Sequence, residues 1–157
     1  MTLERTVDIL SKIETQKSTN RISFYEPYQY QKEFHDAKDF NDNFAQQRLL
    51  MAANKVGKTF CGACEVALHL LGEYPDWWKG HRFDRPVKVW CAGMTTANTR
   101  DIIQAELLGE PGDPEDWGKG IIPKNRIMKT ERQPGIPNSL SMVIVKHVSG
   151  RNSRLWF

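Results

Sequence analysis

The feature that most constrains the fold of this chain is the segment of residues 52–59, which ends in the tripeptide Gly-Lys-Thr. The apolar run of residues 48–53 leads into it, and small or apolar side chains at helical spacing follow it as far as Gly72. A short apolar run is typical of a buried parallel strand, and a glycine directly after an apolar helix is typical of a C-terminal cap. The succession of strand, polar turn and helix predicts a phosphate-binding loop.

In such a loop, consecutive backbone N–H groups converge on the phosphates, and the following helix directs its N-terminus at them. Gly57 allows close approach of the backbone, Lys58 neutralises the charge that develops on the phosphates, and Thr59 provides a hydroxyl for Mg²⁺. We therefore predict a site for a nucleoside triphosphate with Mg²⁺, with Lys58 as catalytic residue and Thr59 as metal ligand. The predicted nucleotide-binding residues of the loop are Ala53, Asn54, Lys55, Val56, Gly57, Lys58 and Thr59.

The loop departs from the usual pattern at its first position, where Ala52 replaces glycine, so this turn must accommodate a Cβ atom. A chance match to the relaxed pattern in a chain of this length has a probability of roughly a few per cent. The alternative interpretation is a solvated Gly-Lys-Thr turn that binds nothing.

A second candidate binding residue, Gln31, lies some two dozen residues before the loop, beside Tyr28 and Tyr30. Its amide can both donate and accept hydrogen bonds, so it could read the edge of an adenine while an aromatic ring stacks on the base. The alternative is an exposed glutamine on a helix with core aromatics nearby. The residues alone leave both interpretations open.

The pattern after the loop predicts the fold class. Residues 87–92 alternate as a strand, and Thr95 or Thr96 can cap a helix that runs to Gly109. This β-α repeat predicts an α/β fold of the P-loop NTPase type, with a mainly parallel sheet flanked by helices.

The last part of the chain predicts two further strands. Residues 141–148 and 153–157 read as strands joined by a tight turn. We expect the sheet to be incomplete at its C-terminal edge, with residues 141–157 along that open edge. At the other end, apolar residues at spacings of three and four predict an amphipathic helix over residues 2–15. We interpret residues 1–24 as a helical arm and residues 25–157 as a partial P-loop domain.

Composition excludes some classes of protein. The net charge of +3, from 22 basic and 19 acidic residues, is too balanced to identify a nucleic-acid partner. The absence of a long apolar stretch and of a signal sequence predicts a protein without membrane association, in a reducing cytoplasm. Cys61 and Cys64 have the spacing of a redox or zinc motif, but without a second pair we interpret them as packing residues.

Hydrolysis of a nucleoside triphosphate also needs carboxylates, usually at the end of an apolar strand, for the Mg²⁺ shell and for activation of water. After Thr59, the candidates Asp113, Glu115 and Asp116 stand among prolines and glycines, and no apolar run leads into them. We therefore expect this chain by itself to bind nucleotide weakly and to hydrolyse it poorly or not at all.

A longer pattern surrounds the loop and extends over nearly the whole chain after Tyr25. It consists of Tyr25-Glu26-Pro27-Tyr28, Gln31, Phe34-His35, residues 51–59, Glu65, His69-Leu70, Gly72, residues 74–78, Gly80, residues 82–86, Thr99-Arg100-Asp101, Leu107-Leu108-Gly109, Gly120, Ile122-Pro123, residues 147–153 and Leu155. In these residues the chain resembles the ATPase domain of the large terminase subunit of tailed bacteriophages.

The resemblance implies an ATP-driven translocase that pumps double-stranded viral DNA into a preformed shell, with ATP and Mg²⁺ as cofactors. It implies self-assembly and two protein partners, the small terminase subunit and the portal protein, in the host cytoplasm and transiently at the procapsid portal. It also implies a nuclease domain, which is absent here, and an acidic element soon after the strand near Leu155. We therefore expect an amino-terminal fragment. Two alternatives stay open: a fragment of another P-loop translocase such as a helicase, and a non-enzymatic truncated remnant.

Many terminases have an arginine where Asn54 stands, as a sensor of the γ-phosphate. Lys55 is a candidate substitute, and the alternative is a solvated side chain. Arg82, Arg85 and Arg100 are candidates for a finger that acts on a neighbouring subunit, and the alternative for each is ordinary surface charge.

Overall fold

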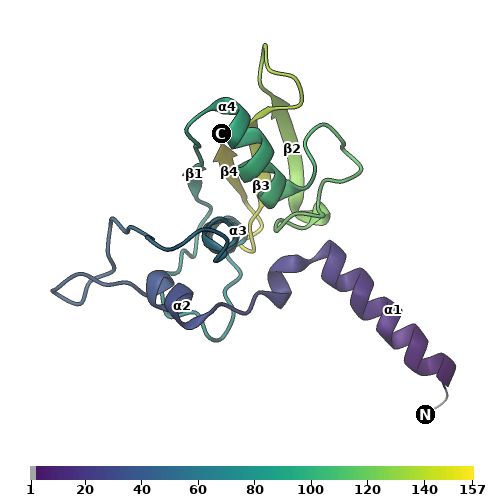
Figure 1. Cartoon of the computed structure of the whole chain (residues 1–157), viewed down its shortest axis with the longest axis horizontal. Coiled ribbons are helices and arrows are strands. Elements are labelled where there is room, and N and C mark those ends of the chain that lie inside the picture. Colours follow the sequence, from purple (N-terminus) through teal and green to yellow (C-terminus); the bar gives the residue numbers. More distant parts are fainter. Residues whose placement is uncertain (1–2) are drawn as a thin grey trace.

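A four-stranded sheet and the helix that packs against it form the centre of the molecule (Figure 1). The computed structural model describes residues 3–157, so residues 1 and 2 of the predicted arm lie outside the described residues. Neighbouring strands pair in the order β1(Lys88–Trp90), β4(Asn152–Trp156), β3(Leu140–Lys146) and β2(Ile127–Arg132). The fold is therefore a mixture of helices and sheet, as the sequence predicts.

The expectation of a mainly parallel sheet is wrong. Only β1 and β4 run parallel, whereas β4 with β3 and β3 with β2 are antiparallel pairs. The reason is the length of the connections, because β3 and β4 are joined by the short turn at residues 147–151, and a turn of this length can only reverse the chain. The same pairing places β3 and β4 in the interior of the sheet, so the expected open edge at residues 141–157 is also wrong. The edges are β1 and β2.

The predicted strand at residues 48–53 is not formed in the described structure. This segment carries no strand or helix, and the side chains of Leu49 and Met51 are 79% and 81% exposed. An apolar run becomes a buried strand only when a neighbouring strand offers a free edge and both faces are covered. Here the sheet has free edges at β1 and β2, but neither strand pairs with residues 48–53, and the exposed side chains of Leu49 and Met51 are not covered.

The helix predicted to follow the loop is confirmed as α3(Lys58–Leu71). It ends at Gly72, which has the left-handed conformation φ 71°, ψ 16° and donates its N–H to the carbonyl of Leu68 at 2.9 Å. Eight of its side chains are buried, and the helix packs against β1, β3 and β4 on one side, while Glu65 and Cys61 contact His35 of α2 on the other. The helix therefore holds the end of the loop, residues 58 and 59, on a rigid support.

The helix predicted after β1 is also confirmed, in three consecutive pieces: α4(Thr96–Asn98), the wider π-helical turns of η2(Thr99–Gln104), and α5(Ala105–Leu108). Thr95 caps it, because its hydroxyl accepts the N–H of Asn98 at 3.1 Å. The 3₁₀ turn η3(Lys124–Arg126) then precedes β2. Together with α3, these segments bury a core that contains Leu70, Leu71, Leu107, Leu108, Ile121, Ile122, Val143, Val145 and Leu155.

The amino-terminal helix α1(Leu3–Thr19) extends away from the rest of the molecule (Figure 1). It is followed by η1(Arg21–Phe24) and by α2(Gln29–His35), which approaches the loop before α3. The predicted helix thus exists and is one turn longer than expected, but its apolar side chains Val7, Leu10 and Ile13 are 59%, 55% and 38% exposed. The boundary between arm and domain stays a prediction.

Candidate functional site

The loop before α3 turns sharply, and two of its residues have positive φ angles. Lys55 has φ 63°, and Gly57, which caps the start of α3, has φ 81° and ψ 23°. A Cβ atom on Gly57 would lie 3.3 Å from the Gln31 amide nitrogen, so glycine serves here both for its conformation and for its small size. The first backbone N–H groups of α3, which have no partners within the helix, therefore start directly at this turn.

The side chain of Lys58 extends back to the first residues of the loop. Its ammonium group donates hydrogen bonds to the carbonyls of Ala52 and Ala53, at 2.7 and 2.6 Å. Both acceptors are neutral, and an anionic phosphate oxygen is a stronger acceptor for an ammonium group. The ammonium group is thus held by the first residues of the loop, and a role of Lys58 in binding phosphate stays a prediction.

Two clefts flank the loop. The first, of about 590 Å³, lies between α3 and β1 and is lined by Lys58 and Thr59 together with apolar side chains such as Val66 and Trp90. The second, of about 600 Å³, lies on the side of α2 and is lined by Lys55, Val56 and Gly57 together with an aromatic wall. The wall consists of Tyr25, Tyr28, Tyr30 and Phe60. The loop therefore separates an apolar cleft beside Thr59 from an aromatic cleft beside Gly57.

Gln31 of α2 contacts the loop from the side of the aromatic cleft and is 2% exposed. Its side-chain oxygen accepts the N–H of Tyr28 at 2.9 Å, and its amide nitrogen donates to the carbonyl of Gly57 at 3.3 Å. The hydroxyl of Tyr30 donates to the carbonyl of Val56. The structure thus brings Gln31, Tyr30 and the predicted loop together, 26 residues apart in the sequence. A role of Gln31 in reading a base stays a prediction.

A buried charged network connects α2, α3 and the segment before the loop, and the sequence does not predict it. Glu65 of α3 accepts hydrogen bonds from Arg48, from His35 Nδ1 at 2.8 Å and from His69 Nε2 at 3.5 Å. The second ring nitrogen of His35 is 3.0 Å from the hydroxyl of Tyr25. The network joins α2, α3 and the residues that lead into the loop. The only signal in the sequence is a glutamate on the apolar side of a predicted helix.

The charges in this network stabilise one another. Burial favours the neutral form of Glu65, but the hydrogen bonds from His35, His69 and Arg48 outweigh burial and lower its pKa to about 2. For His35, burial favours the neutral ring, but hydrogen bonds with Cys61 and Glu65 outweigh it and raise its pKa to about 9. At neutral pH the network therefore combines a buried carboxylate with a buried imidazolium and the Arg48 guanidinium.

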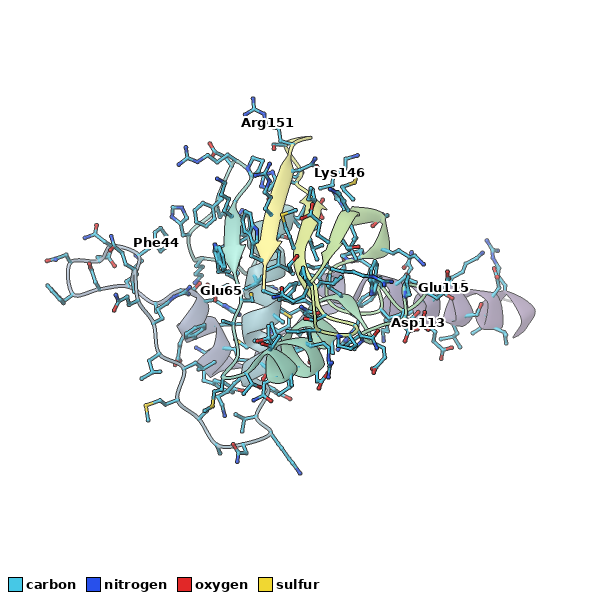
Figure 2. The ribbon with its side chains drawn as sticks, turned by 90° about the horizontal axis from the view of Figure 1, so that it is seen from above. Phe44, Glu65, Asp113, Glu115, Lys146 and Arg151 are labelled. Carbon is cyan, nitrogen blue, oxygen red and sulfur yellow. The ribbon has the colours of Figure 1, made fainter. Side chains whose placement is uncertain are left out.

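Neither the two cysteines of α3 nor the acidic candidates line the two clefts. Cys61 and Cys64 are fully buried, Cys61 Sγ lies 3.6 Å from His35 Nε2, and burial raises the pKa of the Cys64 thiol. Asp113 and Glu115 lie in an exposed loop at the periphery (Figure 2), and in the described structure neither they nor Asp116 line the two clefts.

The finger candidates also have local contacts or lie at the surface. Arg100 pairs with Asp101 at 2.5 Å and donates to the carbonyl of Pro137 at 3.0 Å. Arg82 donates to the carbonyl of Trp78 at 3.0 Å, and Arg85 is exposed. Their action on a neighbouring subunit stays a prediction.

Comparison with known proteins identifies the family. Residues 49–155, which contain the loop and all of the sheet except Trp156 at the end of β4, match the family described as the terminase large subunit, T4likevirus-type, N-terminal. The chain therefore belongs to this family of terminase large subunits, and the resemblance seen in the sequence is confirmed.

Among individual proteins, the chain is similar to the large terminase subunit of Salmonella phage P22. The two are 34% identical over 154 residues, a match that covers 90% of this chain and 30% of the phage protein. The chain thus spans less than a third of the length of this relative. No solved structure was found to match the chain.

Proposed function

We propose that this chain is the ATP-binding part of a viral DNA-packaging motor and that it binds ATP at residues 53–59. The observation that carries the proposal is the position of Lys58, whose ammonium group is held by two neutral carbonyls at the N-terminus of α3. Phosphate oxygens would replace these carbonyls, and the free N–H groups at the start of α3 would bind them in addition.

The two clefts suggest how the rest of the ligand fits. The base would occupy the aromatic cleft, where the rings of Tyr28 and Tyr30 stack with their centroids 6.0 Å apart, next to Gln31. The hydroxyl of Thr59 would face the opposite cleft and hold Mg²⁺, which would neutralise part of the phosphate charge when bound. Asn54 and Lys55 would contribute backbone N–H groups from the exposed part of the loop.

Hydrolysis would depend on carboxylates beside Lys58 and Thr59, and among the described residues no Asp or Glu lines their cleft. Asp113, Glu115 and Asp116 do not line the cleft that contains Lys58 and Thr59 in the described structure. We therefore expect binding with little turnover in this chain alone. Translocation of double-stranded DNA, with the small terminase subunit and the portal protein as partners, would belong to the whole protein.

The test is isothermal titration of the chain with a non-hydrolysable ATP analogue and Mg²⁺. We expect Lys58→Ala to weaken binding at least about tenfold, since a charge-assisted hydrogen bond contributes about 1.5–3 kcal/mol. Lys79→Ala, which removes an exposed lysine outside the site, should bind like the wild type. If the wild-type chain binds no analogue, the proposal fails and the non-enzymatic remnant is favoured.

A further inference from the structure

The face of the sheet that points away from α3 carries an unusual set of side chains, which we call the outer sheet face. Two rows of side chains cross this face from β1 through β4 to β3. One row consists of Lys88, Arg154 and Ile144, and the next consists of Trp90, Trp156 and Met142. Side chains alternate between the faces of a strand. The neighbours Val89, Val143, Val145 and Leu155 therefore belong to the inner face, where the last three are fully buried.

Two tryptophans stack on the outer sheet face. The rings of Trp90 and Trp156 lie 5.7 Å apart at an interplanar angle of 17°, and Trp90 is 76% exposed. An indole with so much surface in water, supported from one side by a second indole, offers a flat apolar platform. Such a platform fits the face of another planar ring.

Cations surround this platform. Lys88 and Arg154 lie in the adjacent cross-strand row, and Lys146 and Arg151 lie at the hairpin end of the sheet, where Figure 2 shows both at the upper edge of the molecule. Among the described residues, none of these four side chains has an acidic partner within ion-pair distance. The outer sheet face therefore has uncompensated positive charge beside an exposed aromatic pair.

We propose that the outer sheet face binds single-stranded nucleic acid. Unpaired bases can stack on Trp90, while the phosphates contact Lys88, Arg154 and the cations at the hairpin. A duplex would keep its bases paired and could use only the cations. A second copy of this chain, placed face to face, would bring like charges together. The side chains of this surface alternate with those that face α3, and at the edge strand β1 Trp90 also borders the cleft that contains Lys58 and Thr59. The inference does not depend on nucleotide binding at the loop.

The test is fluorescence anisotropy of the full chain with labelled oligothymidylate of about 15 nucleotides, a length within the range that such surfaces occupy. We expect Trp90→Leu to weaken binding at least fivefold and Trp90→Phe to restore most of it, because phenylalanine stacks and leucine does not. Lys88→Glu with Arg154→Glu should weaken binding at least tenfold and flatten its dependence on salt. Phe40→Ala, at a 98% exposed ring elsewhere, and Lys79→Glu should bind like the wild type.

Several results would overturn the proposal. One is equal affinity of wild type and Trp90→Leu, and another is binding of a duplex as tightly as of the single strand. A third is concentration-dependent self-association, seen by sedimentation, that Trp90→Leu abolishes without any nucleic-acid binding by the wild type. Lys58→Ala should still bind the oligonucleotide, so failure of this proposal and failure of the nucleotide site can be distinguished. An oligouridylate arm tells whether RNA binds as well as DNA, and binding of either strand supports the proposal.

Discussion

Glu65 is the residue whose environment differs most from what its type suggests. It is a charged side chain on the buried face of α3, 6% exposed, and it is stabilised by the Arg48 guanidinium and the His35 imidazolium, with the His69 ring 3.5 Å away. If one charged residue of this network is removed, the others stay buried without a partner of opposite charge. The resulting loss of folding free energy is larger than the net stabilisation that the intact ion pairs provide. The network also ties Arg48, at the start of the segment that leads to the loop, to the helix that follows the loop.

Glu65→Gln should therefore lower the free energy of unfolding by about 3 kcal/mol, because it leaves a buried imidazolium and a guanidinium without their carboxylate. Urea unfolding followed by tryptophan fluorescence measures the change. Glu33→Gln, on the exposed side of α2, is the matched control and should change stability little. An equal effect of the two substitutions would contradict a charged network.

The same residues predict the pH dependence of stability. The pKa of Glu65 is lowered from 4.5 to about 2, so the stability that its ionised form provides is present above pH 4.5 and is lost as the pH falls towards 2. The pKa of His35 is raised from 6.5 to about 9, so its contribution is present below pH 6.5 and is lost as the pH rises towards 9. Unfolding midpoints measured from pH 3 to 9 should be highest between these two ranges, and His35→Gln should remove most of the alkaline loss.

At the scale of elements, the end of α3 and the β3–β4 hairpin are fitted to each other. Val148 donates its N–H to the carbonyl of Leu71 at 2.8 Å, and the buried ring of His147 lies directly over Gly72. A Cβ atom on Gly72 would come within 2.1 Å of His147 Nε2. The glycine thus ends the helix and leaves room for the hairpin that holds it.

Gly72→Ala should lower the free energy of unfolding by more than about 1 kcal/mol, because the left-handed conformation and the contact with His147 both oppose a side chain. The control is Gly62→Ala in the middle of the same helix, where a Cβ atom would meet no atom within 4 Å. That change should raise stability by about 0.5–1 kcal/mol, through a lower entropy of the unfolded chain. Thermal unfolding of both variants checks the opposite signs.

At the scale of the whole molecule, the chain divides into a packed centre and a projecting helix. The core is formed by α3, the α4 to α5 segment and the sheet, whereas α1 extends outward with its apolar side chains exposed (Figure 1). Helices in proteins derive most of their stability from packing, and α1 has little. Among the described residues, no helix combines the length and apolar character needed to cross a bilayer.

Deletion of residues 1–19 should change the free energy of unfolding of the remaining chain by less than about 0.5 kcal/mol, because surface segments away from the core contribute little. Urea unfolding of the two chains measures this difference. All five tryptophans lie after this segment, so their fluorescence reports the unfolding of the centre in both chains. A loss of more than about 1 kcal/mol would mean that α1 packs against the body in solution.

What the sequence by itself determined is local. The Gly-Lys-Thr turn, helix α3 with its cap at Gly72, the Thr95 cap and the β3–β4 hairpin all depend on residues close together in the chain, and their periodicity and turn residues were sufficient to predict them. The family was also readable, since it depends on the spacing of motifs along the chain.

What only the tertiary structure decided is long-range. Strand direction and edges depend on which strands meet, so an apolar run at residues 48–53 that looked like a central strand is left unpaired. The Gln31 contact with Gly57 and the His35 contact with Glu65 join residues 26 and 30 positions apart. Neither contact leaves a periodic signal, because a hydrogen bond between distant side chains depends on how the elements pack and not on the spacing of the residues along the chain.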